Sequence, residues 1–260
     1  MIERSEAPFL YHQDEGRGTP VVLIHGVGAD GASWDPIVAA LSPLCRVIRM
    51  DLRGHGRSGQ IGGDCSLDDF VRDVTDTMDA CEVGCAHIVG FSLGGMIAQA
   101  VALQHPGRVD RLVLLSAVAA RSDEERARVH QRLATLRTHG VAAISGAAQE
   151  RWFTPAFIAR NPDLVAARMA QLQHNHAASY AAAYTVFSLS DLGDRLHAIR
   201  HPTLVATGEH DPGSNTRMAR FMHAQIAGSQ LQILPGLRHA VLIEAPDQIV
   251  SILRTFLGLG

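Results

Sequence analysis

The residues best placed to do chemistry are a serine and its glycine neighbours, in the stretch Gly90-Phe91-Ser92-Leu93-Gly94. An apolar run typical of a strand precedes this stretch at 86–89, and a run typical of a helix follows it at 96–103. At such a turn the serine side chain is pushed out at the tip, because glycines let the flanking backbone approach closely. The start of the helix adds N–H groups and the positive end of its dipole. The sequence therefore predicts that Ser92 is a nucleophile.

A serine hydroxyl needs a base and an orienting carboxylate to attack at neutral pH, and candidates for both lie later in the chain. Asp211 and His239 each lie in a loop that follows a strand-like run. The chain order Ser, Asp, His is an established order for such a triad. We predict a triad of Ser92, Asp211 and His239. Glu209 remains an alternative carboxylate, although alternation along an extended segment would send it in a different direction from Asp211.

Attack on a carbonyl also requires N–H donors for the negative charge that develops on its oxygen. One donor is expected on the residue after the nucleophile and another in the loop after an early strand. These positions correspond to Leu93 and to Val27, which lies in the loop His25-Gly26-Val27-Gly28. We predict that their backbone N–H groups form an oxyanion hole.

Strand-like and helix-like runs alternate along much of the chain, which indicates an α/β fold with a mainly parallel central sheet flanked by helices. The expected strands are 21–24, 46–51, 86–90, 111–116, 203–207 and 231–234, with an early edge strand at Phe9-Leu10-Tyr11-His12. The expected helices are 34–41, 67–81, 93–104, 215–226 and 246–257. All the candidate site loops then follow the carboxyl ends of strands, where open α/β sheets bind ligands.

The alternation breaks between Ala120 and Arg200, a stretch without a strand candidate that is too long for one crossover. We predict a helical cap inserted at 121–200, with 1–120 and 201–260 forming the core. A cap would exclude water and shape the acyl pocket.

Five motifs resemble those of α/β-hydrolase fold enzymes along the whole chain. They are H-G-V-G at 25–28, D-L-R-G-H-G-R-S at 51–58, G-F-S-L-G-G at 90–95, G-E-H-D-P at 208–212 and R-H-A at 238–240. The resemblance implies that the 51–58 stretch braces a turn near the serine, so His55 is not the base. It also disfavours a haloalkane dehalogenase or an epoxide hydrolase, which would need an aspartate in place of Ser92.

Further features are similar to 3-oxoadipate enol-lactone hydrolases, namely Trp34-Asp35-Pro36, Arg151-Trp152-Phe153-Thr154-Pro155 and Tyr180-Ala181-Ala182-Ala183. The chain departs from that pattern at 25–26 and at 211–215, so the resemblance carries over the fold and triad but not the substrate. The aromatic candidates for the pocket wall, with ordinary helix packing as the alternative for each, are Trp34, Trp152, Phe153, Tyr180 and Tyr184. Arg151 is a candidate for a substrate carboxylate, with a surface salt bridge as the alternative.

These residues predict hydrolysis of a small carboxylic ester or lactone through an acyl-Ser92 intermediate, with water as second substrate. The reaction needs no metal or organic cofactor, and no dinucleotide, Walker or zinc motif is found. Other enzymes with the same parts include C–C bond hydrolases, thioesterases, amidases, acyltransferases and perhydrolases. A slow-turnover ligand receptor of this fold is the alternative outside enzymes.

Composition fits this interpretation. A chain of 260 residues with net charge −3 suits one domain with a large core and shows no nucleic-acid footprint. The mixed charges at 121–128 suggest a solvated helix face. The acidic, polar start at 1–6 is unlike a signal peptide, and no run reaches the length of a membrane span. Four cysteines lack a disulfide or zinc pattern. We expect a cytoplasmic protein without membrane partners, and the sequence leaves homo-oligomerisation open.

Overall fold

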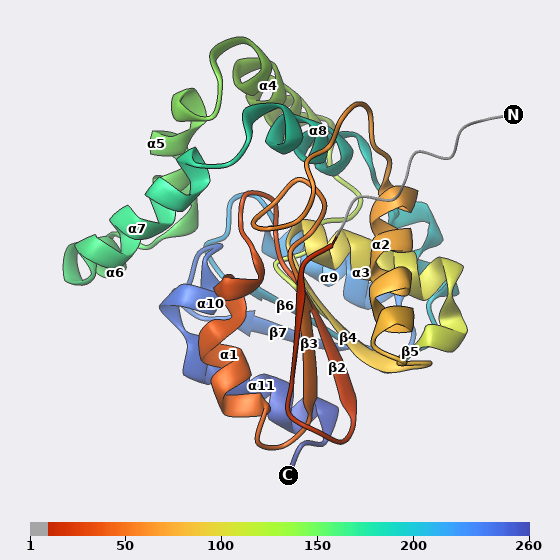
Figure 1. Ribbon diagram of the computed structural model, residues 1–260. Coiled ribbons are helices and arrows are strands. Elements are labelled where there is room, and N and C mark those ends of the chain that lie inside the picture. The colour runs from red at the N-terminus through yellow and green to blue at the C-terminus, as the bar shows by residue number, and fades with distance from the viewer. Residues whose placement is uncertain (1–9) are drawn as a thin grey trace, which may run out of the picture.

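The computed structural model describes residues 10–260. Within them the core is a seven-stranded sheet in the order β1-β3-β2-β4-β5-β6-β7, seen near the middle of Figure 1. The edge strand β1 is antiparallel to β3, and all the other neighbours are parallel. The strands are β1 (His12–Glu15), β2 (Pro20–Ile24), β3 (Arg46–Met50), β4 (Ala86–Phe91), β5 (Val109–Leu115), β6 (Thr203–Gly208) and β7 (Gln230–Leu234). The predicted mainly parallel α/β sheet is confirmed.

Helices bury both faces of the sheet. Side chains alternate across a strand, so Val21 and Leu23 of β2 lie in one buried cluster while Val22 and Ile24 lie in another. This explains why the strand reads as a continuous apolar run. The first cluster is covered by α1 (Asp35–Leu41) and α11 (Pro246–Leu257). The second is covered by α2 (Leu67–Ala80), α3 (Leu93–Gln104) and α9 (Thr216–Gln225).

Local signals in the sequence set the ends of several helices. Ser66 and Asp69 form a reciprocal capping box at the start of α2, in which each side chain accepts from the other's backbone N–H. Ser122 and Glu125 do the same at the start of the next long helix, α4 (Asp123–His139). Helix α11 ends at Leu257 and is followed by Gly258, whose φ of 70° is a left-handed conformation that glycine adopts without strain.

The expected helical insertion follows β5 and precedes β6. Its α-helices are α4, α5 (Ala142–Trp152), α6 (Pro155–Arg160), α7 (Pro162–Gln173) and α8 (Ala177–Leu189). Figure 1 shows them as a layer of their own, to one side of the sheet. Short helical segments elsewhere are η1 (Gly31–Trp34), η2 (Pro106–Arg108), η3 (Gly193–Ala198) and α10 (Val241–Glu244).

One carboxylate joins the two ends of this insertion. Asp191, after α8, accepts hydrogen bonds from the N–H groups of Ala120 (2.8 Å) and Arg121 (3.0 Å), before α4. The same carboxylate accepts from Gly193 N at 2.9 Å. The chain therefore leaves the core and returns to it at nearly the same point.

The first strand lies further along the chain than expected. We predicted it at 9–12, whereas β1 spans His12–Glu15 and pairs His12 with Met50. Apolar residues drew the prediction to the earlier segment, but backbone pairing with β3 decides the register, and a polar edge strand also discourages unwanted pairing. Phe9 and the 1–6 stretch lie outside the described residues. The four cysteines are free, and Cys45 and Cys81 are buried.

Candidate active site

The sequence-predicted site lies where neighbouring strands send the chain to opposite faces of the sheet. The loop after β2 leads to α1 on one face, and the turn after β4 leads to α3 on the other. Strands β2 and β4 are adjacent, so a crevice is expected at their carboxyl ends. Ser92 lies directly after β4, at this switch point.

Ser92 has the strained backbone expected of a nucleophile at a sharp turn. Its φ is 55° and its ψ is −113°, a combination that non-glycine residues rarely adopt. The N–H of Ser92 donates to Leu115 O at 2.9 Å, which ties the turn to the next strand, β5. The side chain is almost entirely buried yet lines a cavity. Neighbouring structure therefore holds the backbone of Ser92 in a strained conformation.

Glycines make this turn sterically feasible. A Cβ on Gly90 would collide with Gly94 O, and a Cβ on Gly94 would collide with Ile24 O at the end of β2. On Gly95 it would lie 2.6 Å from Ala117 Cβ. The backbone of strand, turn and helix is thus too close for side chains at these positions.

Asp211 and His239 come together from loops after β6 and β7. His239 Nδ1 lies 2.6 Å from Asp211 Oδ2. The other oxygen of Asp211 accepts from the N–H groups of Gly213 (2.8 Å) and Ser214 (2.9 Å). Burial acts to raise the pKa of Asp211, but the charge and hydrogen bond of His239 and the two N–H groups outweigh it and lower that pKa. The buried carboxylate is thereby kept ionised beside the imidazole.

Glu209 lies in a different setting. Its side chain is about half exposed (48 %), and Oε2 accepts from Gly236 N at 2.9 Å. Asp211, by contrast, is buried and contacts His239 directly. The geometry favours Asp211 as the partner of the histidine.

The N–H groups of Val27 and Leu93 are available as donors. Within residues 10–260, neither donates to a protein acceptor. Leu93 N is free because it belongs to the first turn of α3, whose N–H groups have no partners within the helix. The loop of Val27 lies against the turn, since a Cβ on Gly26 would be 3.1 Å from Ser92 Cβ. Both N–H groups therefore belong to backbone segments that lie beside the serine.

The 51–58 loop braces this region, as the resemblance implied. The N–H of Leu52 donates to His25 Nε2 at 2.9 Å, and His25 packs edge-on against His55 with ring centroids 5.3 Å apart. Burial lowers the pKa of His25 to about 4 and that of His55 to about 3. Both imidazoles are thus neutral near pH 7.

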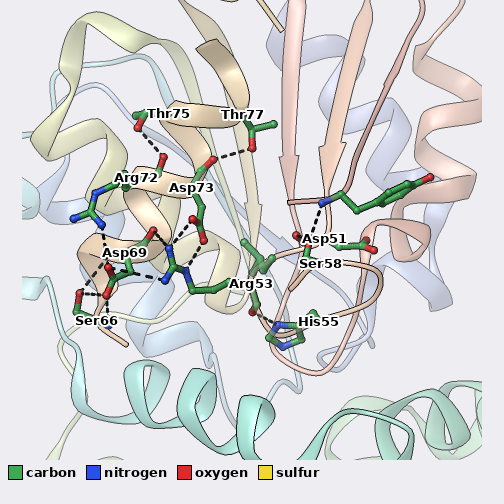
Figure 2. Close-up of polar contacts among 12 residues, drawn as sticks. Asp51, Arg53, His55, Ser58, Ser66, Asp69, Arg72, Asp73, Thr75 and Thr77 are labelled. Atoms are coloured by element: carbon green, nitrogen blue, oxygen red, sulfur yellow. Dashed lines mark hydrogen bonds and ion pairs between the residues drawn. The ribbon is translucent and has the colours of Figure 1, made fainter. Parts of the chain in front are cut away.

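A buried ion pair anchors the same loop to helix α2. Figure 2 shows Arg53 reaching α2, where Nε and Nη2 donate to both oxygens of Asp73 at 2.6 and 2.7 Å. In the same view Ser58 Oγ donates to Asp51 O at 2.5 Å. His55 lies in this bracing loop and is absent from the cavity lining, which agrees with its exclusion as the base.

A cavity of about 100 Å³ brings the candidate residues together. Its lining includes Ser92, Asp211, His239 and Val27. Of the predicted pocket aromatics, it also includes Trp152, Tyr180 and Tyr184. Phe91, which we did not predict, lines it and packs on His239 with ring centroids 5.1 Å apart.

Trp34 and Phe153 do not line the cavity. Trp34 is fully buried beneath the sheet among the side chains of α1 and α11. Phe153 is fully buried in a small cluster in which it stacks on Phe157, with centroids 5.6 Å apart. Both therefore serve as packing residues, the alternative allowed for each aromatic.

Arginines form much of the cavity wall, and of these the sequence interpretation named only Arg151. The lining includes Arg121, Arg128, Arg132, Arg151 and Arg168. Arg121 and Arg128 belong to the 121–128 stretch that was interpreted as a solvated helix face, and Arg121 is in fact buried. A signal for Arg168 was present, because Val165, Met169 and Leu172 place it on the apolar side of α7.

The described part of the chain has neither a metal-binding cluster nor a membrane-spanning helix. Residues 10–260 contain no group of three or more His, Cys, Asp or Glu side chains arranged to hold a metal ion. None of their helices combines the length and apolar character needed to cross a membrane.

Comparison with known proteins finds similar sequences and structures among hydrolases. A family model described as alpha/beta hydrolase fold matches residues 19–246. The (E)-2-((N-methylformamido)methylene)succinate hydrolase of Acinetobacter baylyi is 30% identical, over 98% of this chain and 97% of that protein. The enol-lactonase of Burkholderia xenovorans LB400 has a TM-score of 0.91 and 29% identity, over 97% and 98% of the two chains. A meta-cleavage product hydrolase of Pseudomonas fluorescens IP01 has a TM-score of 0.82 and 25% identity, over 96% and 94%.

The fold and these matches define a hydrolase. The chain belongs to the alpha/beta hydrolase family. Within it, the chain is of the type that acts on esters, lactones or C–C bonds.

Proposed function

We propose that this protein is a serine hydrolase that cleaves a small carboxylic ester or lactone through an acyl-Ser92 intermediate. One observation carries the proposal. Ser92, held at a strained turn, shares a cavity with His239, whose Nδ1 lies 2.6 Å from the buried carboxylate of Asp211.

His239 acts as the base in this mechanism. Because Asp211 occupies Nδ1, the nitrogen left for Ser92 is Nε2. Nε2 takes the hydroxyl proton while Oγ forms a bond to the substrate carbonyl carbon. Asp211 stabilises the imidazolium that results.

The developing oxyanion accepts hydrogen bonds from the N–H groups of Val27 and Leu93. When the intermediate collapses, the carbonyl forms again and the bond to the leaving oxygen breaks. That oxygen takes the proton from His239, which leaves acyl-Ser92. In a lactone the leaving alcohol stays attached to the acyl chain.

Water completes the cycle. His239 removes a proton from water, the hydroxide adds to the acyl carbon, and Ser92 leaves as the alcohol with the proton returned by His239. Tyr180 and Tyr184 of α8 and Trp152 of α5 form part of the wall around the acyl group.

Intact-protein mass and phenolate release together test the proposal. The protein is incubated with excess p-nitrophenyl acetate, with Ser92→Ala as the control. We expect multiple turnovers in the wild type and neither turnover nor an acyl adduct in the variant. Wild-type rates retained by Ser92→Ala would contradict the proposal. Release of one equivalent over hours would instead support the receptor alternative, since enzymes cycle at roughly 1–1000 per second on their own substrates.

The similarity to a meta-cleavage product hydrolase supports a second candidate, hydrolysis of a C–C bond. The same serine would attack a ketone, and the leaving carbon would need a proton. A panel with an aryl ester, a five-membered enol lactone and a vinylogous 1,5-diketone separates the two. The highest kcat/KM identifies the bond that the site cleaves.

A further inference from the structure

Three guanidinium groups of the inserted helices line the cavity, and within the part of the chain that the structure describes none has a partner of opposite charge. They are Arg132 of α4, Arg151 of α5 and Arg168 of α7. Within the described residues no carboxylate oxygen lies within 4.0 Å of any of them, the limit for an ion pair. Three cations thus converge from three helices on one small space.

The surroundings of Arg168 leave a donor unused. Its guanidinium lies over the ring of Trp152, 4.6 Å from the ring centroid. Its Nη1 is buried and has no hydrogen-bond partner in the part of the chain described. Leaving a buried donor of a charged group without a hydrogen bond costs free energy. A ligand that accepts a hydrogen bond from this group would remove that cost.

Arg132 and Arg151 extend the same positive surface. Arg132 donates through Nε to Tyr184 Oη at 3.0 Å, which fixes its direction. Burial and the charge of Arg132 lower the pKa of Arg151, and burial lowers that of Arg168 to about 10. A bound anion would reverse both effects.

The other charged groups of the cavity are already engaged or lie in solvent. Glu125 pairs with Arg217 and accepts from Asn215, and Asp211 is held by His239. Arg121 donates to the carbonyls of Phe187 and Ser190, and Arg128 is exposed. Among residues 10–260, no acidic side chain that lines the cavity is therefore free to neutralise the three arginines.

We propose that Arg151 and Arg168, supported by Arg132, form a carboxylate-binding subsite, so that the substrate carries a carboxylate in addition to its ester or lactone bond. A planar carboxylate matches the fork of a guanidinium and accepts two parallel hydrogen bonds. The anion would also offset part of the positive charge of the three arginines. The inference rests on the proposed function, since it concerns the substrate of the same cavity.

Two esters of similar size test the subsite. The p-nitrophenyl monoester of glutaric acid carries a free carboxylate, and p-nitrophenyl valerate does not. We expect the wild type to favour the charged ester in kcat/KM by about 10- to 100-fold, the range for a charged hydrogen bond. Arg168→Met and, independently, Arg151→Met should lose most of this preference, because kcat/KM falls much further for the charged ester than for the valerate ester. Arg160→Met, an exposed arginine of α6 outside the cavity, is the matched control and should keep the preference.

Equal kcat/KM for the two esters in the wild type, or equal losses on both esters in the arginine variants, would overturn the subsite. A second readout separates this from failure of the proposed function. Glutarate is titrated calorimetrically into Ser92→Ala and into Ser92→Ala combined with Arg168→Met. We expect binding by the first and at least tenfold weaker binding by the second. Hydrolysis that persists in Ser92→Ala would refute the nucleophile while leaving this binding result standing.

Discussion

The backbone N–H of Leu52 donates to His25 Nε2 at 2.9 Å, and this bond joins the loop after β2 to the loop after β3. On its other side the ring of His25 contacts Gly26 O through Nδ1 at 2.8 Å. The imidazole therefore fixes the loop that carries Val27. It can accept from Leu52 only while it is neutral.

The burial of His25 and His55 makes stability depend on pH. Their pKa values are about 4 and 3 in the folded protein and about 6.5 in the unfolded chain. Between about pH 6.5 and pH 4 the unfolded chain binds more protons, so stability falls as pH is lowered through this window. We expect a loss of about 2 kcal/mol per histidine between pH 7 and pH 5, measured by urea unfolding.

Replacement of His55 isolates this effect. His55→Phe keeps a ring against His25 but cannot titrate, so it should reduce the loss between pH 7 and pH 5 by about 2 kcal/mol. His197→Gln, at an exposed position, should leave the loss unchanged. An unaltered pH dependence in His55→Phe would show that this residue does not carry it.

The two acidic candidates near His239 predict unequal effects on turnover. Asp211→Asn should lower kcat by about 10⁴-fold, because an amide in place of the carboxylate favours the wrong tautomer of the imidazole. Glu209→Gln should leave kcat within a few-fold, since Glu209 contacts Gly236 N instead. Steady-state kinetics of both variants at pH 7.5 make the comparison. Similar losses in the two would refute the assignment of Asp211.

Two glycines predict opposite effects of one added methyl group. Gly94→Ala places a Cβ against Ile24 O and His25 O, so we expect a loss of about 1–3 kcal/mol or more. Gly146, inside α5, has nothing within 4 Å of such a Cβ. Gly146→Ala should stabilise the protein by about 0.5–1 kcal/mol. Urea unfolding of both variants measures the difference, and a mild effect of Gly94→Ala would mean that the turn can relax.

The free energy of unfolding should depend strongly on whether both Arg53 and Asp73 of the buried ion pair are present. Arg53→Met leaves the buried Asp73 carboxylate unpaired and should cost about 3–5 kcal/mol of unfolding free energy. Adding Asp73→Leu should recover most of that loss, because no isolated charge remains. The control is Arg72→Met, whose exposed pair with Asp69 should matter by less than about 1 kcal/mol. A double variant as unstable as the single one would argue that the loop needs the pair itself.

Much of the fold was predictable because the spacing of apolar residues and the positions of glycine, proline and helix-capping residues indicate the same elements. Six of the expected strands and all five of the expected core helices are present, for example the strand at 203–207 as β6 and the helix at 93–104 as α3. Edge strand β1 was misplaced, since a half-exposed strand is defined by its backbone partner and not by an apolar run.

The candidate site was likewise predictable in part. Ser92 directly follows β4, and Asp211 and His239 lie in the loops after β6 and β7, so their convergence at one edge of the sheet could be anticipated. The wall of the cavity could not, because it depends on which side of each inserted helix faces inward. Trp34 was expected at the cavity and lies in the core, whereas Arg132 and Arg168 were not expected there. The type of a residue alone does not reveal which way its side chain points.

The hydrogen bonds of the Asp191 carboxylate bear on how the inserted helices could be replaced. It holds the departing chain at Ala120 and Arg121 beside the returning chain at Gly193, so everything between is a loop closed at its base. Because the two ends are held together, we expect that a different set of helices could be grafted between them while β5 and β6 keep their pairing. New substrate preferences can then evolve, or be engineered, by swapping one continuous stretch of gene without rebuilding the sheet below.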